Sequence, residues 1–426
     1  MMTTGKSFQT NWQKLFPEMC KKIKKAENLA ILSSCCGVTG EAVLTDSAVI
    51  LLFAASLGGK EYLGLLSMAV LPLLNGLLIL PLAKLSNRFG NRKLITGANI
   101  LALCGYFLAA SAPWWGNTPG KMILLGGILF FSICQTGFLA GWFPFLESFL
   151  LPERRTLFLG RMRFYHQLAA VSFLGLTAFL IGREPAVNIL QRVLFLGGII
   201  FAGRILFISL IAKFPEVDRK SLPWLSGIRT AVKNPALKYF SFYTLLLNLG
   251  LFSPAGVILQ QCKSIYYIPE NELILISGSV IAGPVAGYAT AAFLEKIYGK
   301  WNLLTALHFL GLGAIFSLLF ITSETLWGKF AATLLLMTIS FVIAAGSVIC
   351  GATVMAFAPP GNKTLAMAFW GCFYYGGGGF SRLFAALTIS CGKLPLYLSL
   401  FFVLTAFLPL LAGRTFIQQE QQWNNR

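Results

Sequence analysis

The sequence predicts an all-α polytopic membrane protein in which twelve transmembrane helices form two six-helix bundles. The 426 residues are 56% hydrophobic and only 12% charged, with a mean hydropathy of +0.73, whereas soluble domains carry about 25% charged residues. Apolar stretches long enough to cross a hydrocarbon core of about 30 Å recur along the chain. Backbone groups in lipid must pair internally, and the period-2 alternation of a barrel is absent, so we expect these stretches to be helices.

The apolar stretches fall into two groups of six. The longest interior polar stretch, 213–238, separates them near the midpoint of the chain and is expected to be a linker with an amphipathic helix on the inner face. We therefore expect the bundles at 29–212 and 239–413, after a basic segment 1–28 and before a tail 414–426. The twelve stretches are 29–54, 62–83, 94–113, 121–146, 165–182, 190–212, 239–260, 273–294, 302–322, 326–350, 365–390 and 395–413.

The positions of lysine and arginine orient these spans. With the N-terminus inside, 25 of the 34 basic residues fall in inner segments and seven in outer loops, which predicts that both termini are cytoplasmic. Residues 1–27 hold six lysines and no apolar signal-peptide core, so we expect them to be retained. The expected location is the cell membrane, as a multi-pass monomer. Because the net charge of +19 lies in loops, it is a topology signal and argues against a nucleic-acid partner.

Several function classes are disfavoured by what the sequence lacks. The nine cysteines are scattered and mostly lie in apolar runs, there are two histidines, and no Cys-x-x-Cys occurs, so no metal site or disulfide framework is expected. The phosphate-binding loop Gly-x-x-x-x-Gly-Lys-Ser/Thr is absent, which argues against an ATP-driven pump. An enzyme would need convergent acids, histidines or metal ligands at one membrane face. We expect neither a cofactor nor enzymatic activity.

Two polar segments indicate an internal duplication. The second span ends in LAKLSNRFGNRKL, and the second span of the other half ends in AAFLEKIYGKWNL. Their glycines, Gly90 and Gly299, are 209 residues apart, close to half the chain length. This spacing indicates a repeat of a six-span unit.

The first of these segments resembles the loop between spans two and three of the major facilitator superfamily. Arg88, Gly90 and Arg92 match the basic and glycine positions of the family pattern, and Lys93 continues the basic run, whereas Asn87 stands where the family has an acid. The segment 152–163 is similar to a second loop pattern of the family, between spans four and five. The resemblance implies a secondary transporter whose two bundles rock about a central site, exposing it alternately to each side.

The loop motif is also expected to act as a cytoplasmic gate. Its glycine permits a close turn between two helices, and its cations can pair with acids or helix C-termini. The resemblance implies that the acid of this motif helps to stabilise the outward-facing state. Asn87 stands at that position and carries no charge, so this contribution is missing here. Glu147, at the inner end of span four, is a candidate partner for Arg88 or Arg92, and a solvated Glu147 is equally compatible with the sequence.

Four ionisable residues lie within the spans, where such side chains mark pathways or ion pairs. Glu41, near mid-membrane in span one, is the leading candidate for proton coupling or substrate contact. Asp46 is about 140° further round the helix, so we expect one of the two acids to pair or cap. Arg382 in span eleven is a candidate anion contact. Arg204 in span six is expected to form an internal ion pair or to reach the headgroups.

Uncharged polar residues on the predicted cavity spans are further candidates for substrate contact, although each is equally suited to bond a neighbouring helix. The glycine run 376–379 in span eleven indicates either a moving, substrate-lining segment or close helix packing. The candidates are Gln135 in span four, Tyr243 and Asn248 in span seven, and Trp370, Tyr374 and Tyr375 beside the glycine run.

Together these features predict a transporter of a small molecule, with proton-coupled uptake of a polar metabolite such as a sugar or an organic anion. An exporter of drugs or metabolites with the same fold is the main alternative. A polytopic membrane enzyme fits less well, because the inner loops carry few acids and the outer loops are very short.

Overall fold

The computed structural model describes residues 17–150, 155–214, 224–321, 325–357 and 363–424, and every regular element in these ranges is a helix. Short 3-10 turns, η1 (Ala112–Trp115) and η3 (Ile389–Cys391), accompany the α-helices. In chain order the α-helices are α2 (Pro17–Thr45), α3 (Ala48–Ser56), α4 (Glu61–Phe89), α5 (Asn91–Ala110), α6 (Asn117–Glu147), α7 (Arg155–Leu180), α8 (Val187–Leu210), α9 (Trp224–Lys233), α10 (Pro235–Leu251), α11 (Ser253–Ser264), α12 (Glu270–Tyr298), α13 (Lys300–Leu318), α14 (Leu326–Phe357), α15 (Lys363–Thr388) and α16 (Leu394–Asn424).

Within the described ranges, ten helical segments are long and apolar enough to cross a membrane. They correspond to ten of the twelve expected spans. The remaining two expected spans are α7 and α15, each 26 residues long. The helix α7 contains three arginines, among them Arg163, and α15 contains Arg382. The all-helical membrane architecture is confirmed, and the count of twelve spans stays a prediction.

Two expected spans differ from the prediction because each is broken into two helices. The stretch 29–54 is interrupted between Thr45 and Ala48, where Ser47 is extended, with φ −144° and ψ 168°. Thr45 and Ser47 donate their hydroxyls to carbonyls one turn back, a bond that competes with the regular helix and bends it. The stretch 239–260 is interrupted at Phe252, just before Pro254, whose ring cannot continue the preceding helix.

The expected turn glycines have the backbone conformation that only glycine adopts readily. Gly90 has φ 79° and precedes α5, and Gly299 has φ 74° and precedes α13. A side chain at either position would strain the backbone. The same turn therefore recurs 209 residues apart, at the same place in each half.

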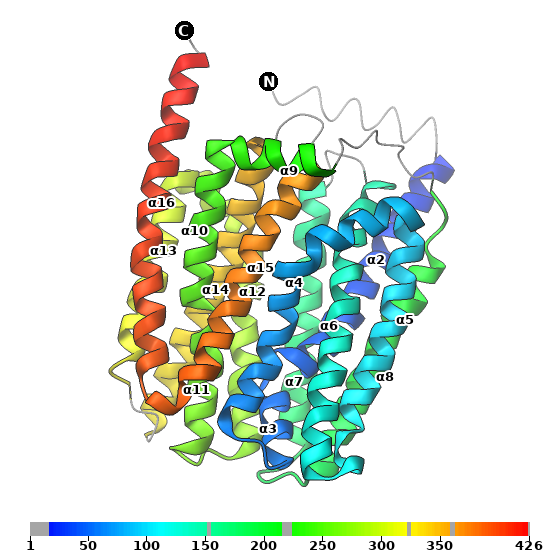
Figure 1. The fold of residues 1–426 in the computed structure, drawn as a ribbon, viewed down its shortest axis with the longest axis vertical. Coiled ribbons are helices and arrows are strands. Elements are labelled where there is room, and N and C mark those ends of the chain that lie inside the picture. Colours follow the sequence, from blue (N-terminus) through cyan, green and yellow to red (C-terminus); the bar gives the residue numbers. More distant parts are fainter. Residues whose placement is uncertain (1–16, 151–154, 215–223, 322–324, 358–362, 425–426) are drawn as a thin grey trace.

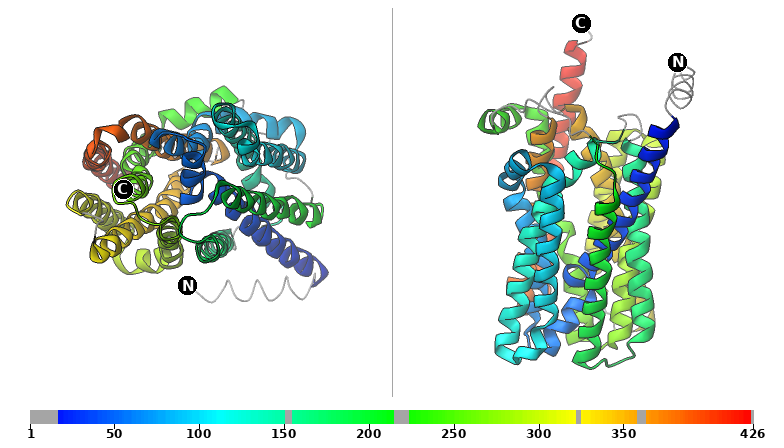
Figure 2. Two further views of the ribbon diagram at one scale, coloured as in Figure 1. Left: turned by 90° about the horizontal axis from the view of Figure 1, so that it is seen from below. Right: turned by 90° about the vertical axis from the view of Figure 1, so that its right-hand side faces the viewer.

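The helices form two bundles that meet along a central interface (Figures 1 and 2). In the first half α2 packs on α7 and α8, and α5 packs on α6; in the second half α10 packs on α16, and α12 on α14. Between the halves α4 packs on α15 and α7 on α12. The short helices α3 and α11 contact each other and the opposite half. They lie at the end of the molecule away from the start of α2 and the end of α16, which share one end (Figure 1).

Glycines allow the central helices to approach very closely. A Cβ atom on Gly76 of α4 would lie 2.5 Å from the backbone of Gly376 on α15, and one on Gly379 would lie within 2.5 Å of the backbone of Leu73. Gly377 contacts α10 in the same way. The run 376–379 is buried within a continuous helix, so close packing, one of the two alternatives from the sequence, accounts for its position.

The last helix extends beyond its predicted limit, and the linker contains the expected helix. The helix α16 continues to Asn424, well past the expected end of the last span at 413. In the linker, α9 lies across the end of the bundle beside α15 (Figure 1), and residues 215–223 lie outside the described ranges. Most of the basic segment 1–28, residues 1–16, lies outside them as well.

Candidate functional site

Glu41 lies at the centre of a polar cluster in the first bundle. The Nε2 atom of Gln135 on α6 donates to the Oε2 atom of Glu41 at 2.5 Å, and the Nη2 atom of Arg204 on α8 lies 3.9 Å from the same oxygen. The Glu41 side chain keeps 29% of its surface exposed, whereas Arg204 is only 2% exposed. The carboxylate thus stands between a buried cation and accessible space within the protein.

Arg204 is fitted into the bundle by small and aromatic neighbours. Its guanidinium carbon lies 4.3 Å from the centre of the Phe138 ring and 5.1 Å from that of Phe201. Gly37 leaves the space that the guanidinium occupies, since a Cβ atom there would overlap it. The Nε and Nη1 atoms of Arg204 have no acceptor among the described residues. Of the two alternatives for Arg204, the internal ion pair is the one that the geometry matches.

The second predicted acid pairs across the two bundles. Asp46, at the break between α2 and α3, accepts from the Nη2 atom of Arg382 on α15 at 2.5 Å. The Nη1 atom of Arg382 donates to the backbone oxygen of Met68 on α4 at 2.9 Å, and its guanidinium lies over the ring of Phe252, 5.5 Å from the centre. Asp46 is 52% exposed and Arg382 is 12% exposed. Both acids therefore pair, one within a bundle and one between bundles.

Arg163 is a cation at the bundle interface that the sequence analysis assigned to an inner loop. It lies within α7, and its guanidinium carbon is 5.3 Å from the centre of the Tyr288 ring on α12 of the opposite bundle. It is close enough to interact electrostatically with the hydroxyls of Tyr374 and Tyr375 on α15. No carboxylate among the described residues pairs with it.

The aromatic candidates on α15 cluster beside this cation. Trp370 and Tyr374 have ring centres 5.1 Å apart, and Tyr374 and Tyr375 have theirs 5.2 Å apart, with perpendicular planes. Tyr375 also lies within electrostatic range of Glu41. The Nε1 atom of Trp370 is buried without an acceptor in the described part of the chain. Arg163, Tyr288 and the α15 aromatics thus bring polar groups of both bundles together.

Tyr243 and Asn248 of α10 have structural partners. Tyr243 is 1% exposed and packs against His308, with ring centres 6.1 Å apart. Asn248 donates its Nδ2 atom to the backbone oxygen of Tyr374 at 2.9 Å. Asn248 therefore links α10 to the glycine-rich part of α15, the helix-bonding alternative that the sequence left open.

The gate motif is only partly described. Arg92 donates its Nη2 atom to the backbone oxygen of Ser209 near the end of α8, at 2.9 Å, so this cation meets a helix C-terminus as such motifs are expected to do. The side chains of Asn87, Arg88 and Glu147 lie outside the described residues, and the expected pairing of Glu147 stays a prediction. Among the described residues no three potential ligands (His, Cys, Asp or Glu) are grouped as a metal would require.

Comparisons with known proteins identify the class to which this architecture belongs. The family model of the Major Facilitator Superfamily matches residues 30–382, so the chain belongs to that superfamily. It is accordingly a multi-pass membrane transporter and not an enzyme. A search of curated protein sequences finds no match.

Solved structures with the same fold belong to transporters of different substrates. A bacterial homologue of the iron transporter ferroportin, in an outward-facing state, has a TM-score of 0.66 at 14% identity, covering 92% of this chain and 99% of that one. The nucleoside transporter NupG has a TM-score of 0.67 at 14% identity, with the same coverage. The transporter FucP, described for E. coli as a fucose:proton symporter, has a TM-score of 0.64 at 12% identity, covering 91% and 98%. At these identities the likeness concerns the fold alone.

Proposed function

We propose that this protein is a proton-coupled secondary transporter that takes up a small organic anion, such as a carboxylated or phosphorylated metabolite. Arg163 is the principal anion contact, and Glu41 is the group that carries the proton. The aromatic residues Trp370, Tyr374 and Tyr375 provide the remaining wall of the site. The two bundles rock about this site, so that it opens alternately to each side of the membrane.

The observation that carries the choice of an anion is the unpaired charge of Arg163. Arg204 and Arg382 each have a carboxylate partner, whereas the neighbours of Arg163 among the described residues are the aromatic side chains of Tyr288, Tyr374 and Tyr375, which carry no charge. A cation inside a membrane protein is costly unless an anion accompanies it, and an arginine offers a planar fork of donors to a carboxylate or phosphate. A substrate that brings a negative charge would supply the missing partner.

The proposed proton carrier combines exposure with a cation close behind it. Glu41 is accessible, is held by Gln135, and stands 3.9 Å from a buried arginine with spare donors. Protonation of Glu41 would release Arg204 from its counter-charge, and deprotonation would restore it, so the charge of the cluster changes with proton binding. The fucose:proton symporter shows that the fold supports such coupling.

Binding of the anion can be tested on the purified protein in detergent. Ligands that bind the folded state raise its unfolding midpoint by mass action, so a panel of dicarboxylates, sugar phosphates, nucleosides and neutral sugars is screened at two pH values. We expect shifts only with anions, and loss of these shifts in Arg163→Gln. The matched control is Arg161→Gln, which removes an exposed cation two residues away on the same helix. A neutral sugar that shifts wild type and Arg163→Gln alike would contradict the proposal.

The direction of transport needs a separate measurement. In proteoliposomes, an anion that enters with its proton accumulates when the outside is acidic and the inside is neutral. We expect this gradient to drive accumulation and the reversed gradient to drive loss. An exporter that exchanges its substrate for protons, the alternative with the same fold, would respond to the two gradients in the opposite way.

A further inference from the structure

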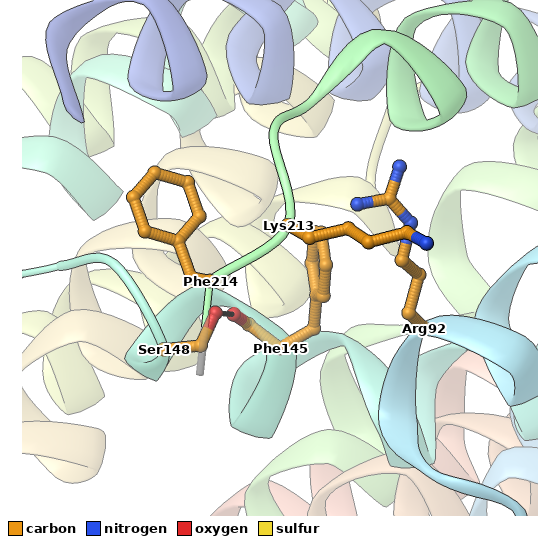
Figure 3. Close-up of a pocket in the computed structure, with 5 residues that line it drawn as sticks. All are labelled: Arg92, Phe145, Ser148, Lys213 and Phe214. Atoms are coloured by element: carbon orange, nitrogen blue, oxygen red, sulfur yellow. Dashed lines mark hydrogen bonds between the residues drawn. The ribbon is translucent and has the colours of Figure 1, made fainter. Parts of the chain in front are cut away.

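A cavity lined by both basic and aromatic side chains lies away from the central site, at the end of the first bundle. It has a volume of about 160 Å³ and is lined by Arg92, Phe145, Ser148, Lys213 and Phe214 (Figure 3). This end is the one where α2 begins and α16 ends (Figure 1), which the distribution of basic residues predicts to be cytoplasmic. The space is roughly ten times the minimum that one water molecule needs, enough for a tetrahedral oxyanion.

Two cations of this cavity have no carboxylate partner among the described residues. The Lys213 side chain extends toward Arg92 (Figure 3), and neither forms an ion pair with a carboxylate in the described part of the chain. Arg92 uses its Nη2 atom on the backbone oxygen of Ser209, while its buried Nη1 atom has no acceptor among the described residues. Two like charges that line one cavity repel each other unless an anion lies between them.

The remaining walls suit an anion that is attached to an apolar group. The hydroxyl of Ser148 donates to the backbone oxygen of Phe145 at 2.7 Å, so the donors left for an anion are those of Arg92 and Lys213. Phe145 and Phe214 provide an aromatic floor, and both contact Phe149, with ring centres 5.8 Å and 5.4 Å apart. Arg92 is partly buried while Lys213 is exposed, so the cavity opens at its charged rim.

We propose that this cavity binds a phosphate group, and that its source is the headgroup of an anionic phospholipid in the adjacent leaflet. Arg92 and Lys213 hold the phosphate oxygens, and the aromatic floor contacts the glycerol part of the lipid. Occupation would tie the start of α5, the end of α6 and the end of α8 together on the cytoplasmic side. This inference is independent of the transported substrate.

The test uses the purified full-length protein in detergent and short-chain lipids. Dioctanoyl phosphatidylglycerol is titrated against the unfolding midpoint, with dioctanoyl phosphatidylcholine as the zwitterionic control and potassium phosphate, at constant ionic strength, as the free anion. We expect phosphatidylglycerol to stabilise wild type, and the double variant Arg92→Gln, Lys213→Gln to bind it about tenfold more weakly, because it lacks two charge-assisted contacts. Arg163→Gln, which alters only the central site, should bind the lipid as wild type does.

Lys93→Gln is the matched control, because it removes a cation next to Arg92 without touching the cavity. A phosphate effect that is as large as the lipid effect, and is lost in the same double variant, supports the phosphate site but assigns it to a free solute. Equal lipid binding by wild type and the double variant, or an equal loss in Lys93→Gln, would overturn the proposal. If the Arg92 substitution impairs folding, Lys213→Gln alone decides, since this side chain is exposed.

Discussion

The two arginine–carboxylate pairs of this protein differ in where they lie relative to the two bundles and in how far they are buried. Glu41 and Arg204 belong to the same bundle, and their geometry is set by helices that move together. Asp46 and Arg382 belong to opposite bundles, so a rocking motion must separate them. The first pair hides its cation at 2% exposure, whereas the second leaves its acid 52% exposed. The pair of Glu41 and Arg204 lies within one bundle, so it is suited to a carboxylate that binds and releases a proton without a change of shape. The pair of Asp46 and Arg382 joins the two bundles, so it is suited to stabilise one conformation of the protein.

The largest loss of stability is expected when the pair of Glu41 and Arg204 is broken. Arg204→Gln removes the cation that faces Glu41 and leaves a space beside Phe138 and Gly37. We expect a loss of about 3 kcal/mol in the free energy of unfolding, as for other buried ion pairs that lose one partner. The measurement is thermal or chemical unfolding in detergent.

A double-mutant cycle sharpens this comparison. The coupling energy between Glu41→Gln and Arg204→Gln should exceed that between Asp46→Asn and Arg382→Gln. The Asp46 carboxylate is half exposed, so solvent screens its pair toward the range of about 0–1 kcal/mol. Equal coupling energies would show that the two pairs do not differ in the way their burial indicates.

The next largest effect concerns the contact between α4 and α15, beside Arg382. In Gly76→Ala, the added Cβ atom would lie 2.5 Å from the backbone of Gly376, and neither backbone can move without parting the helices. We expect a destabilisation of about 2 kcal/mol, in the range of overpacked cores. Gly97→Ala on α5 is the control, since nothing lies within 4 Å of its added atom. Because alanine favours a helix more than glycine does, Gly97→Ala should be as stable as wild type or more stable. An equal loss of stability in Gly97→Ala would contradict an origin in the α4–α15 contact.

The smallest change in free energy is expected when the pair of Asp46 and Arg382, which joins the two bundles, is broken. Asp46→Asn removes an ionic contact whose carboxylate is half exposed, which should shift the equilibrium between conformations by about 1 kcal/mol. Spin labels at positions 60 and 267, on the loops that follow α3 and α11, report the distance between the two bundles at that end. We expect a larger fraction of long distances in Asp46→Asn than in wild type. An unchanged distribution would mean that the tight glycine contacts alone keep this end closed.

The fold was largely predictable because composition and apolar length determine it. Lipid leaves helices as the solution for long apolar stretches, and the turn glycines Gly90 and Gly299 were recognised from their spacing and motif. The helix breaks at Ser47 and Phe252 were not predicted. The first has no proline or glycine at the break, and its cause, two hydroxyls bonded to the preceding turn, is visible only in three dimensions.

The candidate site was less predictable than the fold. Glu41, Asp46, Arg204 and Arg382 were found because charges are rare in apolar helices, but their pairing joins residues more than 160 positions apart, and one sequence contains no signal for such contacts. Arg163 was overlooked as a site residue because its position beside other loop cations made it resemble them. Its place within α7 and close to Tyr288 depends on how the two bundles meet.

The central claim is that Glu41 couples transport to protons. Wild type and Glu41→Gln are reconstituted into liposomes and loaded with the anion found in the binding screen; accumulation driven by a pH gradient is compared with exchange at equal pH. We expect Glu41→Gln to lose accumulation while its exchange rate stays within about twofold of wild type, because only the proton step is removed. If Glu41→Gln still accumulated the anion as far as wild type does under the same pH gradient, Glu41 would not be the group that couples transport to protons.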